Sequence, residues 1–98
     1  MDAISIAGSA LTAQSVNVGV IAGNIANVET PGYTQKQADF VPMTPGGGVE
    51  VGAVIDTGQS VDLADQLVNL TMAKTAYDAA ASVLTTASEM TSTLLAAL

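Results

Sequence analysis

A seven-residue apolar repeat near the start of the chain limits the possible folds more than any other feature of the sequence. Four apolar residues are each seven positions apart: Ile4, Leu11, Val18 and Ile25. The accompanying positions of the repeat hold one polar and three apolar residues: Ala7, Gln14, Ile21 and Val28. This spacing predicts an amphipathic helix from about Asp2 to Val28 that packs along its length against another helix.

The repeat stops at a stretch with strong turn chemistry. Thr30 precedes a proline and is therefore biased away from helical geometry, and Pro31-Gly32 fits the two central positions of a type II turn. Asn24 and Asn27 lie close to the predicted helix end, where their amides can bond to unpaired backbone groups. The sequence therefore predicts a helix end built from specific side chains.

The middle of the chain has the pattern of a short β-hairpin. The segment Val49–Ile55, VEVGAVI, is rich in β-branched residues and predicts a strand that ends before Asp56-Thr57-Gly58. Gly46–Gly48 predicts the flexible turn that precedes this strand. An isolated hairpin is only marginally stable in water, so we expect it to lie against other parts of the protein.

A second, longer helix is predicted from about Val61 to Ala97, with Ser60 or Asp62 as its cap and with acidic residues in its first turn. Its first apolar stripe holds Leu63, Leu67, Leu70, Tyr77, Leu84, Leu95 and Leu98. A second stripe holds Ala73, Ala76, Ala80, Val83, Ala87, Met90 and Leu94. One partner helix cannot cover both stripes, and the longer helix should extend beyond the shorter one and expose apolar side chains.

Together these elements predict a mainly α fold. Two long N- and C-terminal helices pair as an antiparallel coiled coil, with a short β-hairpin or loop insertion between them. We expect one domain with three segments: residues 1–30, the N-terminal helix; residues 31–60, the turn and hairpin; and residues 61–98, the C-terminal helix. The residues expected to pack the helices, within the chain or against neighbours, are Ile4, Leu11, Val18, Ile25, Leu63, Leu70, Tyr77, Leu84, Met90, Leu94 and Leu95.

Composition argues against several function classes. The chain has no histidine and no cysteine, so catalysis would depend mainly on a carboxylate pair or a lysine base. Asp62 and Asp65 are explained by their place in the first helical turn, where acids interact favourably with the helix dipole. We therefore expect no enzyme, no cofactor, no metal site and no small-molecule substrate. The net charge of −7 argues against nucleic-acid binding.

A membrane span is also possible by length, because the stretch Ala3–Val28 contains no charged residue. Many serine, threonine, asparagine and glutamine side chains lie inside it, and no basic residue flanks either end, which disfavours insertion. The acidic start, Met1-Asp2, lacks the positive region of a cleavable signal peptide.

Two motifs resemble one known family. AGNIANVETPGY, from Ala22 to Tyr33, resembles the signature of bacterial flagellar rod, hook and hook-associated proteins, usually close to A-N-N-I-A-N-x-x-T-P-G-Y. The segment Val61–Leu98 resembles that family's terminal helix, and Gly46–Val51 resembles the start of the middle region in some members. The chain departs from the usual pattern at Gly23, Lys74-Thr75 and Ala80.

The resemblance implies a rod-type structural subunit. By this likeness, subunits leave the cell unfolded through the flagellar type III export apparatus without a cleaved signal peptide. Their terminal helices then assemble with copies of themselves and with other rod or hook proteins into the periplasm-spanning rod of the basal body. The assembly and turn motif would be Asn24, Asn27, Thr30, Pro31, Gly32 and Tyr33.

Two other interpretations remain open at this stage. The chain could be a stand-alone secreted helical hairpin that lays a helix in the groove of a partner protein. A carboxylate enzyme would need an ordered cleft with converging acids, and the sequence offers no pattern for one. Within the flagellar family, the sequence leaves open whether this is a proximal rod, distal rod or hook-junction protein.

Overall fold

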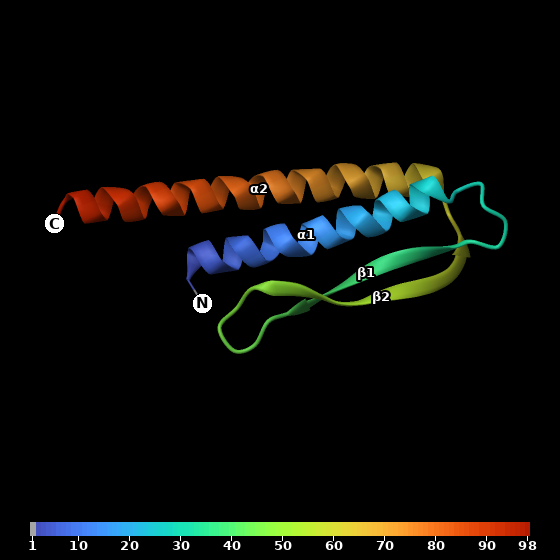
Figure 1. Cartoon of the computed structure of the whole chain (residues 1–98), viewed down its shortest axis with the longest axis horizontal. Coiled ribbons are helices and arrows are strands. Elements are labelled where there is room, and N and C mark those ends of the chain that lie inside the picture. The colour runs from blue at the N-terminus through green and yellow to red at the C-terminus, as the bar shows by residue number, and fades with distance from the viewer. Residues whose placement is uncertain (1) are drawn as a thin grey trace.

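The computed structural model describes residues 2–98, and these form two helices and one two-stranded sheet. The elements follow one another as α1 (Ala3–Ala26), β1 (Thr34–Pro42), β2 (Val49–Ser60) and α2 (Leu63–Ala96). Residue 1, which begins the predicted N-terminal segment, lies outside the described residues. The body is elongated, 62 × 25 × 13 Å, and α1 lies between α2 and the hairpin in the view of Figure 1.

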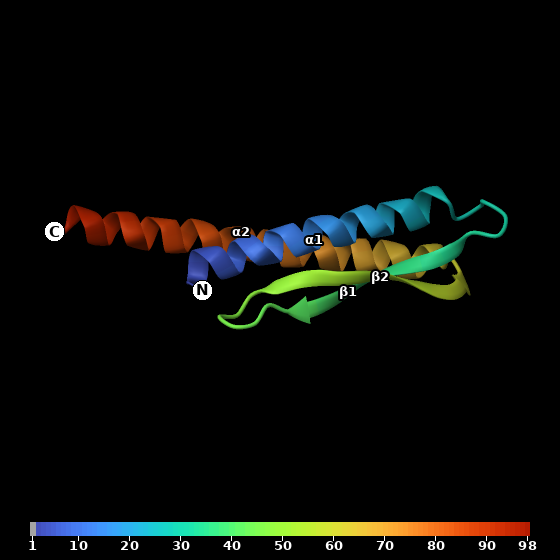
Figure 2. The ribbon, with the colours of Figure 1, turned by 60° about the horizontal axis from the view of Figure 1, so that its bottom comes forward.

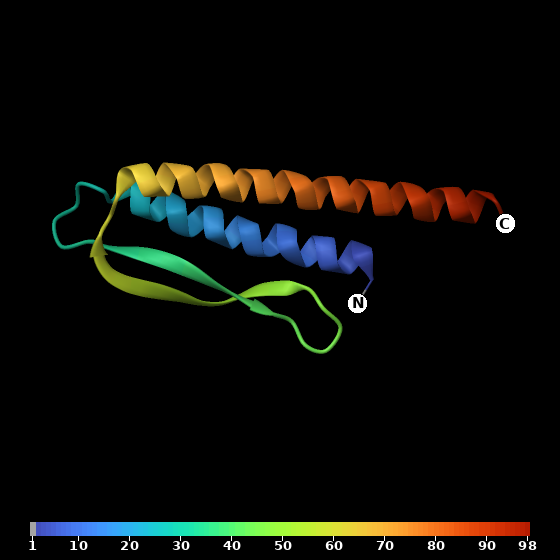
Figure 3. The ribbon, with the colours of Figure 1, turned by 180° about the vertical axis from the view of Figure 1, so that it is seen from behind.

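The two helices lie side by side and run in opposite directions (Figures 1 and 3). The predicted fold, an antiparallel helix pair with a hairpin inserted between its members, is confirmed. The C-terminal part of α2 extends well beyond the start of α1 and beyond the tip of the hairpin, and this holds in the turned view (Figure 2). The predicted overhang of the longer helix is therefore present.

Side chains cap both helices at their N-terminal ends. Asp2 precedes α1, and its Oδ1 accepts a hydrogen bond from the Ser5 backbone N–H at 2.8 Å. Asp62 caps α2 by accepting from the Asp65 N–H at 3.2 Å. Ser60, the other predicted cap, is the last residue of β2. Asp62 has extended backbone angles, so α2 begins at Leu63 rather than at Val61.

The hairpin is antiparallel, and its turn is built on glycine. Gly46, Gly47 and Gly48 all have positive φ angles, which other residues rarely adopt, and the Met43 N–H donates to the Gly48 carbonyl at 3.0 Å. Residues from Lys36↔Asp56 to Pro42↔Val49 are paired, with one irregularity between Asp39 and Phe40. The glycine segment is therefore a turn, as its sequence indicates.

The prediction that the second strand ends before Asp56 is wrong, because β2 continues to Ser60. The pairing register shifts between Thr34 and Lys36, so that β2 contributes extra residues there. Gly58, with φ of 71°, lies in this bulge, and its N–H donates to Asp56 Oδ1 at 2.9 Å. The Asp-Thr-Gly sequence thus forms a bulge within the strand, because Asp56 and Thr57 bond back to β1.

The core is small and rich in alanine. Its buried apolar residues are Ala7, Ala13, Ile21, Ala38 and Ala73. Two polar side chains, Asn24 and Gln66, are also buried. Among the described elements α1 contacts each of the other three, whereas neither strand contacts the backbone of α2. The fold is therefore organised around α1.

The face of α2 that meets α1 differs from both predicted stripes. It runs between them and takes residues from each: Leu70, Ala73, Ala76, Ala80, Leu84 and Ala87 are all buried or half-buried. Gln66, which belongs to neither stripe, is the most deeply buried side chain of this face. Most of these residues are alanines, which let the two helices approach closely, whereas Leu63 and Leu67 stay exposed.

Candidate functional site

The first candidate site is the junction at which α1, β1 and α2 meet, and Asn24 is at its centre. The Asn24 side chain is 0% exposed. Its Nδ2 donates to the Lys36 carbonyl at 2.8 Å and to Gln66 Oε1 at 2.9 Å, and its Oδ1 accepts from the Lys36 N–H at 2.9 Å. One amide therefore ties the first helix to a strand and to the second helix.

The turn after α1 is held by the remaining residues of the motif. Asn27 Nδ2 donates to the Gly23 carbonyl at 2.9 Å, and its Oδ1 accepts from the Thr30 hydroxyl at 3.1 Å. The Tyr33 N–H donates to the Thr30 carbonyl at 3.2 Å, across Pro31 and Gly32. Gly32 has φ of 80°, as the third residue of a type II turn requires. The predicted turn type is therefore present.

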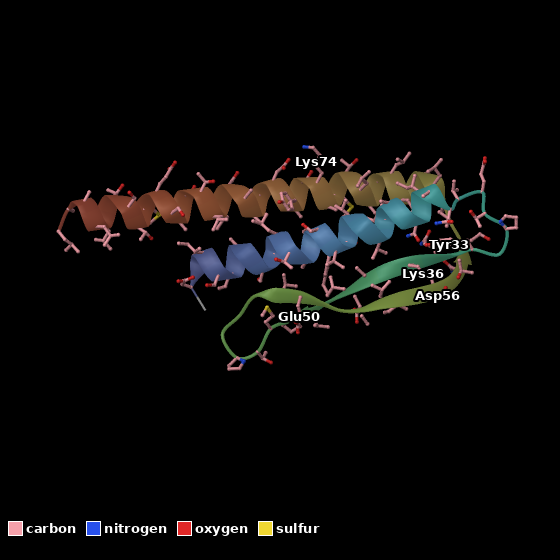
Figure 4. All side chains as sticks on the ribbon, in the orientation of Figure 1. Tyr33, Lys36, Glu50, Asp56 and Lys74 are labelled. Carbon is pink, nitrogen blue, oxygen red and sulfur yellow. The ribbon has the colours of Figure 1, made fainter. Side chains whose placement is uncertain are left out.

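A cluster of polar side chains joins this turn to the base of the hairpin (Figure 4). Lys36 Nζ lies 4.6 Å from the centre of the Tyr33 ring and 3.2 Å from Asp56 Oδ2. Asp56 Oδ1 also accepts from the Thr34 hydroxyl at 2.6 Å. The Thr34 hydroxyl, the Gly58 N–H and the Lys36 ammonium lower the pKa of Asp56 to about 2. The carboxylate therefore stays charged well into the acidic range.

The expected helix-packing residues occupy two different environments. On α1, Ile4, Leu11, Val18 and Ile25 are half-buried, and on α2 so are Leu70 and Leu84. The other five are exposed: Leu63, Tyr77, Met90, Leu94 and Leu95. Within one chain these five do not pack between the helices, because the contact face runs through the neighbouring alanines.

A broad exposed apolar surface on α2 is the second candidate site. It continues into the overhang, where Leu95 is 65% exposed and Leu98 is 96% exposed. Val54 and Ile55 add exposed apolar area on β2. A surface helix usually turns its apolar stripe toward a core. An exposed apolar surface of this extent is therefore typical of a helix that binds a further partner.

Two grooves flank the helix pair. One lies between β1 and α2 with α1 as its floor, and amides such as Gln14, Asn17 and Asn69 line it together with Met72. The other lies between the helices and is lined by Val18, Leu70 and Tyr77, together with the polar residues Ser15, Thr71 and Lys74. Neither groove gathers acids, and no group of three metal-binding side chains occurs among residues 2–98.

The helix α1 is long and apolar enough to cross a membrane if length and composition are the only criteria. In the structure it carries the fully buried Asn24 and contacts α2 and both strands. These contacts are those of a helix that packs within a protein.

Sequence reasoning missed two members of the junction. Gln66 was assigned to no stripe, although it lies seven residues before the buried Ala73 on the same helix face. Lys36 joins the junction through its backbone, which no side-chain pattern could indicate. The sequence does contain one indication of this role. A glutamine on a helix face that meets another helix requires a hydrogen-bond partner, so Gln66 itself points to a polar contact there.

Both ends of the chain match known protein families. Residues 4–34 match the family described as "Flagella basal body rod protein". Residues 57–97 match "Flagellar basal body rod FlgEFG protein C-terminal". A segment of 43 residues is 44% identical to the flagellar basal-body rod protein FlgG of Agrobacterium fabrum (strain C58 / ATCC 33970). That segment is 44% of this chain and spans 16% of the relative's length.

Proposed function

Because the chain belongs to the flagellar basal-body rod protein family, we propose that it is a structural subunit of the rod that assembles through its terminal helices. The observation that carries the proposal is the overhang of α2, where Met90, Leu94, Leu95 and Leu98 are all exposed. Burying a leucine or methionine side chain contributes roughly 1.5–3 kcal/mol, so covering this surface would strongly favour association.

The partners proposed for this surface are copies of the chain and other rod or hook proteins. The matched families are structural, and the chain itself has no histidine or cysteine for catalysis. We therefore assign it no enzymatic activity and no cofactor. The proposed location is the periplasm-spanning rod of the basal body, reached through the flagellar type III export apparatus without a cleaved signal peptide.

The junction around Asn24 has a separate role in this proposal. A rod subunit must hold its two helices in the wall while the intervening segment points in a defined direction. Asn24, together with the turn at Pro31 and Gly32, sets the angle at which the chain leaves α1. Gln66 extends the same bonding to α2. The motif thereby gives each subunit one fixed shape for its neighbours.

Removal of Leu94–Leu98 tests the proposal in cells that otherwise lack the chain. We expect the shortened protein to be exported but not incorporated into purified basal bodies, and motility to be lost. A Thr91→Ala variant, altered just before the overhang's last leucines, serves as the matched control and should incorporate normally. Circular dichroism of the isolated proteins should show the same fold for both.

Normal incorporation of the shortened protein would contradict the proposal. A chain that is absent from basal bodies but forms a stable 1:1 complex with a protein outside the flagellum would instead support the stand-alone helical hairpin.

A further inference from the structure

The strand β1 has one edge that β2 does not cover, and this edge borders the groove between β1 and α2. In an antiparallel pair, every second residue directs both of its backbone groups away from the partner strand. Lys36 directs its N–H and C=O to Asn24, so Ala38 and Phe40, two and four positions further on, direct theirs to the same side. Pro42 follows at the next such position and has no N–H. The uncovered edge therefore offers the backbone groups of Ala38 and Phe40.

These backbone groups have no partner among residues 2–98. Asn24 pairs with Lys36, but no backbone group or side chain of either helix bonds to Ala38 or Phe40. Both residues line the groove, and Ala38 is only 9% exposed. Backbone groups in such a place are nearly always paired in folded proteins, and a row of unpaired ones is a template for another strand.

The outer edge of β2 differs from that of β1, because two bulges interrupt it. Gly52 is an extra residue between the two β2 residues that pair with Asp39 and Phe40. A second bulge contains Gly58. Bulges twist a strand edge and end its pairing with further strands. The paired part of β1 has no extra residue, so its edge is the one that can accept a strand.

The groove beside β1 has room for a short extended segment. Its volume is about 410 Å³, within the range of roughly 300–1,000 Å³ that ligand pockets have. Val20 and Ile21 of α1 lie on its floor, and Asn69 and Met72 of α2 form the opposite wall. A strand beside β1 would cover apolar side chains with one face, and Asn69 could bond to its far edge, as Asn24 bonds to β1.

Asp39 determines which charge this segment should carry. It lies between the two free residues, is exposed and takes a non-hydrogen-bonded position in an antiparallel addition, where opposite side chains are closest. Glu50 lies on the same face of the hairpin, because it pairs with Val41. Both lysines of the chain form ion pairs with other acids, Asp56 and Asp78. A cationic side chain opposite Asp39 would therefore stabilise the pairing, and an acidic one would weaken it.

We propose that the free edge of β1 at Ala38 and Phe40 binds an extended segment of another protein chain as a third, antiparallel strand, with a lysine or arginine of that segment opposite Asp39. The β1 strand of a second copy does not fit this description. The register that uses both free residues of each copy places Asp39 opposite Asp39, which is destabilising. The inference goes beyond the proposed function, because it concerns a different surface and contacts made by the main chain.

A synthetic strand tests the proposal on the whole chain. The probe is the blocked peptide acetyl-Thr-Val-Lys-Val-Thr-amide, which directs both valines toward α1 when its lysine lies opposite Asp39. We would add it to the isotope-labelled protein and follow the amide resonances and their hydrogen exchange. At saturation the amides of Ala38 and Phe40 should exchange about tenfold more slowly or less, whereas the Val54 amide on the outer edge of β2 should not change.

Two control peptides separate main-chain pairing from charge. Methylation of both valine nitrogens keeps the side chains but removes the N–H groups that face β1, so this peptide should not bind. A peptide with glutamate in place of lysine should bind several-fold more weakly, and the difference should shrink in 500 mM salt, where charges are strongly screened.

A pair of proline variants tests the same edge from the side of the protein. Ala38→Pro removes an N–H that points away from β2, so it should leave the hairpin paired and weaken peptide binding about tenfold. Val54→Pro makes the same change in the β2 residue that pairs with Ala38 and should leave binding unchanged. Circular dichroism shows whether each variant is folded, and the methylated peptide decides the question if Ala38→Pro is not.

Three results would overturn the inference. The first is the absence of any change at Ala38 and Phe40 with 1 mM of the lysine peptide. The second is equal binding by the methylated peptide. The third is protection of these amides that rises with protein concentration in the absence of peptide, which would identify a second copy as the occupant. Each of these results could occur while the chain still incorporates into basal bodies through its overhang.

Discussion

Asn24 on α1 pairs with the backbone of Lys36 on β1 as a neighbouring strand would. Its carboxamide donates to the Lys36 carbonyl at 2.8 Å and accepts from the Lys36 N–H at 2.9 Å. Both backbone groups lie on the edge of β1 that β2 leaves uncovered, because a residue of an antiparallel pair directs its N–H and C=O to the same side. A helix side chain thus closes part of a free strand edge.

Replacement of Asn24 by alanine should lower the free energy of unfolding by about 2–4 kcal/mol, because it leaves the half-buried backbone groups of Lys36 and the buried amide of Gln66 without this partner. Urea unfolding followed by circular dichroism measures this. Asn69→Ala, which removes an exposed amide, is the control and should cost under about 0.5 kcal/mol. A double-mutant cycle of Asn24 with Gln66 should show coupling; strict additivity would contradict the bond between them.

Acidic conditions should destabilise the base of the hairpin, because Asp56 loses its charge when it is protonated. Its pKa is lowered from 3.8 to about 2, so its stabilising contribution is complete above about pH 4 and is lost as the pH falls through about 2. The difference in unfolding free energy between the wild type and Asp56→Asn should therefore shrink over this range. Thr34→Val removes the main cause of the shift and should move the loss toward pH 3.8. A difference that stays constant from pH 6 to pH 2 would refute this role.

Two glycines should respond to alanine in opposite directions. Gly32 has φ of 80°, a left-handed conformation that costs alanine about 1–2 kcal/mol, so Gly32→Ala should lower the melting temperature. Gly19 lies inside α1, and a Cβ there would meet no atom within 4 Å. Gly19→Ala should therefore stabilise the isolated chain by about 0.5–1 kcal/mol. Thermal unfolding of both variants measures the contrast, and a shift of the same sign in both would contradict it.

Substitutions of two leucines of α2 should have different effects, one on the stability of the chain and the other on its assembly. Leu84 is half-buried against α1, and Leu84→Ala should cost about 1–2 kcal/mol of unfolding free energy. Leu95 is 65% exposed, so Leu95→Ala should change this free energy by under about 0.5 kcal/mol. Incorporation into basal bodies should instead fall for Leu95→Ala. A large loss of monomer stability from that variant would show that the overhang is packed within the chain.

Much of the fold follows from local rules. The heptad spacing from Ile4 to Ile25 predicted α1, and Asp62, the cap of α2, was one of the two caps that the sequence predicted. Pro31-Gly32 predicted both the stop and its turn type. These features depend on residues within a few positions of one another, because backbone geometry and nearby hydrogen bonds determine them.

The contact between the helices could not be predicted in the same way. On α2 the sequence predicted two stripes, yet the structure buries a face that combines alanines of the second stripe with Leu70 and Leu84 of the first, together with Gln66. Several faces of this helix are apolar enough to be buried, so periodicity alone could not choose among them. The choice depends on how closely the helices approach and on which polar side chains find partners.

The amino-acid sequence alone determined approximately where the helices begin and end, where the chain turns after α1 and how much apolar surface it carries. Only the tertiary structure decided that Asn24 would join Lys36 to Gln66 and that Asp56 would lie in a bulge instead of at a strand end. The physical reason is that capping and turn chemistry act between near neighbours. Burial and cross-chain hydrogen bonds depend instead on segments far apart in sequence, whose relative positions exist only once the whole chain has packed.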